Sequence, residues 1–75
     1  MNIIDWKPKA TKQLLKLHQT LQATIHNEVE NKLSIFPLCQ GVKKLTNHDY
    51  SYRLRIGNYR VFFEFDGIVK IVSIE

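Results

Sequence analysis

Three arginines, Arg53, Arg55 and Arg60, occur close together in the second half of this chain. A guanidinium is permanently charged, and its planar set of N–H donors matches the oxygens of a phosphate. Guanidiniums gathered on one surface can therefore bind a phosphate and stabilise the charge that develops on it in a transition state. Whether these three act together depends on the backbone that carries them.

The backbone around the arginines has the pattern of a β-hairpin. Apolar residues alternate with arginines over residues 52–56, and residues 59–65 are aromatic and β-branched. Between them, Gly57-Asn58 is a two-residue turn signal. Such a turn pairs Ile56 with Tyr59, and the pairing then steps outward residue by residue.

This register divides the hairpin into two faces. The face that must be buried holds Tyr52, Leu54, Ile56, Tyr59, Val61, Phe63 and Phe65. The other face holds Arg53, Arg55, Arg60, Phe62 and Glu64. Arg55 is directly opposite Arg60, where like charges destabilise a sheet, so folding alone does not explain the pair. An anion between the two would remove the repulsion, and Phe62 could stack on a base or pack against an arginine stem.

The alternative is that these arginines are ordinary solvated strand residues, or that Arg53 pairs with Glu64 or with an acidic partner. Lys43 and Lys44 precede the hairpin and form either a basic rim or a solvated turn. His48 lies in the loop before the hairpin, from which it could reach the arginines. We therefore include both lysines and His48 with Phe62 as candidate substrate-binding residues.

No residues have the spacing of a metal or cofactor site. His18, His26 and His48 lack the separations of metal ligands, and there is no glycine-rich phosphate loop. Cys39 is the single cysteine and has no neighbouring base in the sequence, so we expect it to pack rather than react. We expect neither a metal nor a cofactor.

Size and charge are consistent with a small basic domain. The 75 residues suffice for one domain, and 11 Lys and Arg against 7 Asp and Glu give a net charge of +4. This charge suits a nucleic acid or an acidic protein, although many small domains are equally basic without such a partner. One cysteine is typical of a reduced, cytoplasmic setting, and no apolar run is long enough to cross a membrane.

Two helices are predicted before the hairpin. Residues 3–6 resemble a strand, Pro8 suits the first turn of a helix, and residues 18–20 interrupt the helical pattern. A second helix opens at Gln19 or Thr20 and ends at Pro37. Its apolar stripe is Leu21, Ile25, Val29 and Leu33.

A third strand follows the hairpin, over residues 68–74, and a short extended piece is possible at residues 42–45. If Asp66-Gly67 alone formed the second turn, Lys70 would face the core. A three-residue turn instead pairs Phe65 with Val69 and sets Lys70 opposite Glu64, which we favour. The order β-α-α-β-β-β predicts an α+β fold in which a helical hairpin packs on one face of a mainly antiparallel sheet.

The run from Tyr52 to Glu64 resembles the central hairpin of the RelE/ParE toxin superfamily, whose pattern is aromatic-x-hydrophobic-Arg-x-Gly-x-Tyr-Arg-hydrophobic. The order of elements and the Lys44-Leu45 segment are also similar, so the resemblance covers essentially the whole chain. It implies a cytoplasmic toxin of a type II toxin–antitoxin system, held inactive by a cognate antitoxin.

The RelE branch of this superfamily cleaves mRNA on the ribosome without a metal, through attack of the mRNA 2′-OH on the adjacent phosphate. The resemblance thus implies a ribosome-dependent endoribonuclease that inhibits translation. Arg53 and Arg55 match two basic positions of this family, and Arg60 matches an arginine that stabilises phosphate charge. These three are the predicted catalytic residues.

Other functions remain open. The ParE branch shares the scaffold but inhibits DNA gyrase, so the scaffold does not decide the target. Family members usually continue into a short basic and aromatic tail, which we expect this single domain of residues 1–75 to lack. Its nuclease activity would then be weakened, with His48, Tyr50 or Tyr59 as conceivable substitutes, or the chain would only bind its antitoxin. A basic domain without catalytic function is the last alternative.

Overall fold

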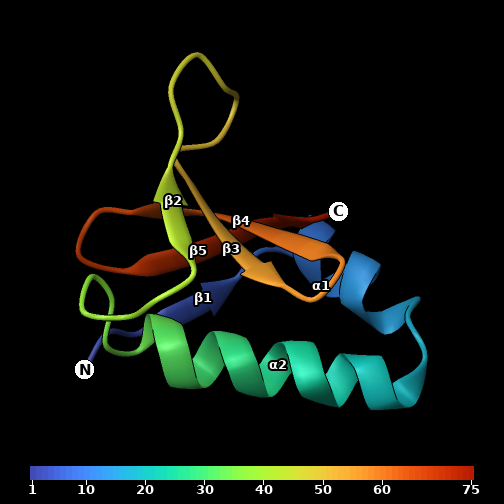
Figure 1. The fold of residues 1–75 in the computed structure, drawn as a ribbon. Helices are drawn as coiled ribbons and strands as arrows, with labels where there is room; N and C mark the ends of the chain where they lie inside the picture. Colours follow the sequence, from blue (N-terminus) through green and yellow to red (C-terminus); the bar gives the residue numbers. More distant parts are fainter.

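A five-stranded sheet with two packed helices forms the fold, seen in a computed structural model that describes residues 1–75 (Figure 1). In chain order the elements are β1 (Ile4–Trp6), α1 (Pro8–Leu15), α2 (Gln19–Leu33), β2 (Val42–Lys44), β3 (Tyr52–Ile56), β4 (Tyr59–Phe65) and β5 (Val69–Ile74). The strand order is β1-β5-β4-β3-β2, with only β1 and β5 parallel. The predicted α+β fold is confirmed, and the possible extended piece at residues 42–45 is the edge strand β2.

The helices begin where the sequence predicts. Pro8 occupies the first turn of α1, and the His18 ring accepts a hydrogen bond from the Thr20 backbone at the start of α2. Helix α2 ends at Leu33, earlier than the predicted end at Pro37. The chain turns more tightly at this point, with the Phe36 backbone N–H donating to the Leu33 carbonyl, and the Phe36 ring packs edge-on against Phe63.

Both hairpins have the predicted register. Ile56 is opposite Tyr59, and Gly57 in the turn has a φ of +56°, which glycine adopts without strain. In the second hairpin Phe65 is opposite Val69, which confirms the three-residue turn. Between Phe62 and Phe63 of β4, the pairing with β5 shifts by one residue at a bulge. The sequence pattern did not indicate this bulge.

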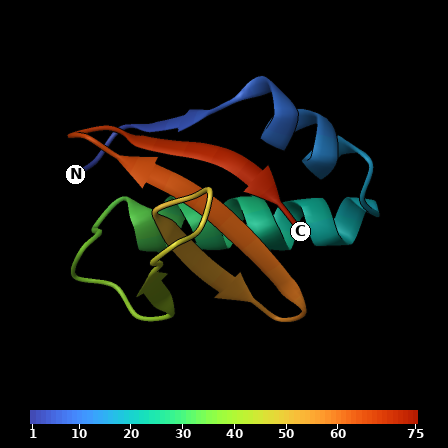
Figure 2. The ribbon, with the colours of Figure 1, turned by 90° about the horizontal axis from the view of Figure 1, so that it is seen from above.

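The core lies between α2, α1 and the sheet, as the view from above shows (Figure 2). Its buried members are Ala10, Ile25, Val29, Leu33, Leu54, Val61, Phe63, Val69, Ile71 and Ile74. The predicted apolar hairpin face and the helix stripe thus meet, although Leu21 is only half-buried. No helix has the length and apolar character that a membrane span requires.

Helix α1 completes one edge of the sheet. Strand β1 pairs with β5 only as far as Ile71, so the end of β5, which pairs with β4 on one side, has no neighbouring strand on the other. There the Gln13 side chain of α1 accepts a hydrogen bond of 2.6 Å from the Ile74 backbone N–H. A side chain therefore takes the place of a strand partner at this position.

Candidate nucleic-acid interface

The arginines lie on the face of β3 and β4 that points away from the buried side chains. Arg55 and Arg60 are directly opposite each other and exposed. The Arg55 N–H donates to the Gly41 carbonyl, at 3.2 Å, and the Arg60 N–H donates to the Glu75 carbonyl, at 2.6 Å. Because both N–H groups point outward from the β3–β4 pair, this is a non-hydrogen-bonded pair, in which side chains come closest.

None of the three arginines forms an ion pair. The ion pairs of the structure are Asp5–Lys7, Glu28–Lys32 and Asp66–Lys70, and none includes an arginine. Arg53 is half-buried, and its Nε is buried without a hydrogen-bond partner. An unsatisfied buried donor costs about 1–3 kcal/mol, so the native interactions around Arg53 do not explain its position.

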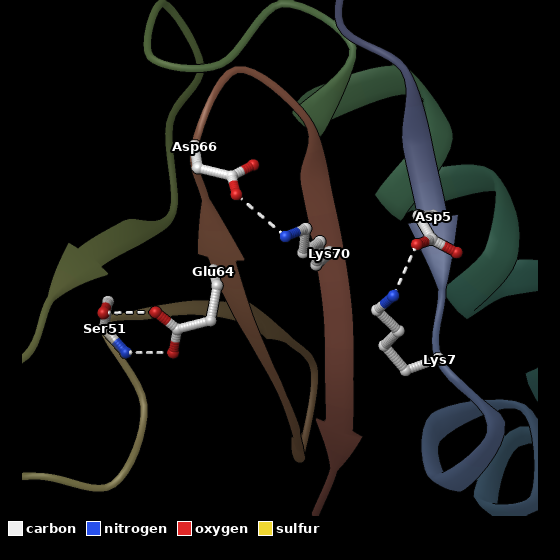
Figure 3. Close-up of polar contacts among 6 residues, drawn as sticks. All are labelled: Asp5, Lys7, Ser51, Glu64, Asp66 and Lys70. Carbon is white, nitrogen blue, oxygen red and sulfur yellow. Dashed lines mark hydrogen bonds and ion pairs between the residues drawn. The ribbon is translucent and has the colours of Figure 1, made fainter.

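Glu64, the acid that shares the arginine face of β4, is engaged elsewhere (Figure 3). Glu64 accepts hydrogen bonds from the backbone N–H of Ser51, at 2.8 Å, and from the Ser51 hydroxyl. Lys70 is opposite Glu64, as predicted, but its ammonium pairs with Asp66 at 2.8 Å. The alternative pair of Arg53 with Glu64 is not formed.

The Asp66–Lys70 contact also shifts the pKa of both side chains. The hydrogen bond from Lys70 lowers the pKa of Asp66, and the same bond raises the pKa of Lys70. Both groups therefore stay charged at neutral pH, and Lys70 holds the Asp66 carboxylate at the second turn.

An aromatic cluster lies beside the arginines on the same face. Phe62, opposite Arg53 on the neighbouring strand, is only 5% exposed. The His48 ring stacks on it at 5.2 Å between centroids and 19° between planes, and the Tyr50 ring contacts it at 5.2 Å and 31°. Phe62 is therefore covered and does not offer a free face to a base, whereas His48 is exposed.

One member of this surface comes from outside the predicted site. The Lys9 ammonium of α1 donates to the Tyr50 hydroxyl at 3.2 Å and lies 5.9 Å from the centre of the Tyr50 ring. Lys9 and Tyr50 are 41 residues apart in the chain, and no sequence pattern joins them. Tyr50 itself was predicted only as a substitute catalytic residue.

The two lysines of β2 point to different faces. Lys43 is opposite Arg53 and extends the arginine face, whereas Lys44 is opposite Tyr52, on the core side of the sheet. Both are exposed at the edge of the sheet. No group of three or more His, Cys, Asp or Glu side chains is arranged to hold a metal ion.

The architecture resembles that of a toxin–antitoxin protein of known structure. A chain in the "Crystal structure of the intact E. coli RelBE toxin-antitoxin complex" matches 99% of this chain with a TM-score of 0.76, over 94% of its own length. The sequences are 19% identical, so this likeness shows the fold. A comparison with curated proteins gave no match.

The sequence match is to a family. Residues 4–75 fit the family described as "ParE toxin of type II toxin-antitoxin system, parDE". The chain therefore belongs to the ParE toxin family, whose members are toxins of type II toxin–antitoxin systems. The resemblance to the RelE/ParE superfamily that the hairpin indicated is confirmed.

Proposed function

We propose that this toxin binds mRNA on the ribosome in the cytoplasm and cleaves it without a metal, and that it thereby inhibits translation. The observation that carries the proposal is the exposed Arg55–Arg60 pair, held on facing strands without a carboxylate partner. A phosphate between the two guanidiniums would replace their mutual repulsion with two charge-assisted contacts.

The proposed reaction is an internal transfer within the RNA. The 2′ oxygen bonds to the adjacent phosphorus and loses its proton, while the bond from phosphorus to the 5′ oxygen breaks and that oxygen takes up a proton. Charge accumulates on the remaining phosphate oxygens in the transition state. Arg55 and Arg60, with Arg53 beside them, would stabilise that charge, and removing one such group from an active site typically slows a reaction about 100- to 1000-fold.

We propose a cognate antitoxin as the second partner. The similar chain was solved as part of a toxin–antitoxin complex, which supports a protein partner of this kind. Apolar side chains on the surface also favour a protein cover. The large exposed ones are Met1, Ile3, Leu15, Ile35, Leu38 and Ile68.

Induced expression in a bacterial host tests the proposal. Translation is followed by pulse labelling, and new mRNA ends on ribosomes are mapped by primer extension. The chain should arrest translation and produce cuts within codons, R60Q should reduce both effects at least tenfold, and K12Q, an exposed charge change in α1, should not. Intact translation and mRNA at a high level of the unaltered chain would refute the nuclease function.

Inhibition of DNA gyrase is the second candidate function. Residues 4–75 match the ParE toxin family, and the ParE branch of the superfamily inhibits gyrase. It predicts loss of gyrase supercoiling activity with purified protein, and no mRNA cleavage. A chain that binds antitoxin but alters neither gyrase nor mRNA would be a toxin homologue without either activity.

A further inference from the structure

The aromatic cluster of His48, Tyr50 and Phe62 is not needed for the arginines to bind a phosphate. We propose that His48 and Tyr50, supported by Phe62, form an aromatic platform that binds a base of single-stranded RNA. We further propose that Lys9 is a positioning residue that holds Tyr50 in this platform. The inference deepens the proposed function, since it rests on RNA as the ligand of this face.

The platform is built on a buried ring, Phe62, and carries an exposed ring, His48. Phe62 is buried beneath His48 and Tyr50, and the centroids of the two upper rings lie 5.7 Å apart. The His48 Nδ1 accepts a hydrogen bond of 3.1 Å from the Tyr50 backbone N–H, which fixes the ring plane and, in the neutral ring, leaves the proton on Nε2. His48 thus presents an exposed ring and an N–H donor, both of which a base can use.

The loop that carries the platform is held at two further points. Ser51 is bound to Glu64 of β4 through its backbone and its hydroxyl, and the Leu45 N–H donates to the Ser51 carbonyl at 2.8 Å. These contacts close the loop at its base, so the rings need little ordering when a ligand binds.

The platform is placed for a nucleotide whose phosphate lies on the arginines. Phe62 is opposite Arg53 and two residues from Arg60 on the same face of β4. Two residues of a strand span about 7 Å, so one nucleotide can reach from a guanidinium to the platform. Bases in a duplex are stacked inside it and cannot reach these rings, whereas single-stranded RNA exposes its bases for stacking on aromatic side chains.

Lys9 acts on the platform through Tyr50. Its ammonium donates to the Tyr50 hydroxyl and lies near the edge of the distance at which a cation is attracted to a ring. Lys9 has no acidic partner, so its charge also adds to this surface. If it only contributed charge, its removal would weaken binding of any polyanion equally; a positioning function makes the effect depend on the base.

Binding of oligonucleotides to the purified protein tests the platform. Affinities for a short oligouridylate and for an abasic oligomer of the same length are measured by fluorescence anisotropy at one salt concentration. Stacking of one base predicts about 5- to 150-fold tighter binding of the oligouridylate. H48A should abolish this difference, whereas R55Q should weaken both ligands by a similar factor.

The positioning function of Lys9 is tested by a variant cycle. K9M and Y50F each remove the hydrogen bond between Lys9 and Tyr50 and should each reduce the base-dependent difference severalfold. The double variant should lose no more than either single one, and K9R should restore most of the difference. Circular dichroism checks that each variant keeps the fold. Additive losses in the double variant would overturn the positioning function.

The platform and the proposed nuclease function can fail separately. A protein that binds the abasic oligomer as tightly as the oligouridylate has no platform, even if it cleaves mRNA on ribosomes. A base-dependent difference without mRNA cleavage would keep the platform and reject the nuclease. If H48A weakens only the complex with a co-expressed antitoxin, the rings are a protein-binding surface and the inference is wrong.

Discussion

Replacing Arg55 with glutamine should stabilise the fold while it removes activity. Arg55 and Arg60 form a non-hydrogen-bonded pair, in which Cβ atoms are about 4.5–5.5 Å apart. The only hydrogen bond of the Arg55 side chain is a long one of 3.4 Å to the Gly57 carbonyl, so R55Q sacrifices little. The variant therefore isolates the repulsion between the two charges.

The size of the effect follows from the geometry. Two unit charges about 7 Å apart in water repel by about 0.6 kcal/mol, within the range of about 0.2–1 kcal/mol for a cross-strand pair. For a domain of this size, that corresponds to a rise in Tm of roughly 1–8 °C. Toxicity should fall in the same variant, because the side chain that destabilises the sheet is the one that binds phosphate.

Urea denaturation, followed by circular dichroism, measures the gain. Because salt screens the repulsion, the advantage of R55Q should be largest in about 10 mM salt and nearly vanish in about 1 M salt. R55K keeps the charge and should show no gain. K44Q removes a charge opposite Tyr52, where there is no second cation, and should show no salt-dependent gain either.

A loss of stability in R55Q would refute this reasoning, since it would mean that Arg55 makes a favourable interaction in the free protein. An equal gain at low and high salt would also contradict it, because a gain from relieved repulsion must decrease with screening. Either result would remove the argument that an anion belongs between the two arginines.

Three further predictions concern the scaffold. I25A should cost about 2–5 kcal/mol, measured by urea denaturation, because Ile25 is fully buried. Q13A should cost about 1 kcal/mol and speed hydrogen exchange at the Ile74 amide, whose acceptor it removes. The lowered pKa of Asp66 implies that its pairing with Lys70 stabilises the fold above pH 3.8 and that this contribution is lost as the pH falls through the folded-state pKa. D66N should therefore reduce the fall in Tm between pH 6 and pH 3, and an unchanged fall would contradict the assignment.

The hairpin could be predicted from the sequence because its information is local. Gly57-Asn58 set one register, and the period of two assigned each side chain between 52 and 65 to a face. The second register followed from the requirement to bury Ile71 and expose Lys70, and it was correct.

Contacts between distant segments could not be predicted in this way. The Lys9–Tyr50 hydrogen bond and the contact of Gln13 with Ile74 join segments that no periodicity relates. The cover over Phe62 was missed for a similar reason, because the alternation of a strand gives the direction of a side chain but not the loop above it. His48 and Phe62 were therefore candidates from the sequence, whereas their stacking on each other and the contribution of Tyr50 and Lys9 emerged only from the structure.

The parallel pairing of β1 with β5 has a consequence for the synthesis of the protein. Strand β5 lies between β1 and β4, and β1 has no other partner in the sheet. Strand β1 must therefore wait until β5 has been made, and until then the helices that follow β1 lack the sheet edge on which α1 packs. Closure of the sheet should thus require that β5 has been made, with the slow closure typical of contacts distant in sequence.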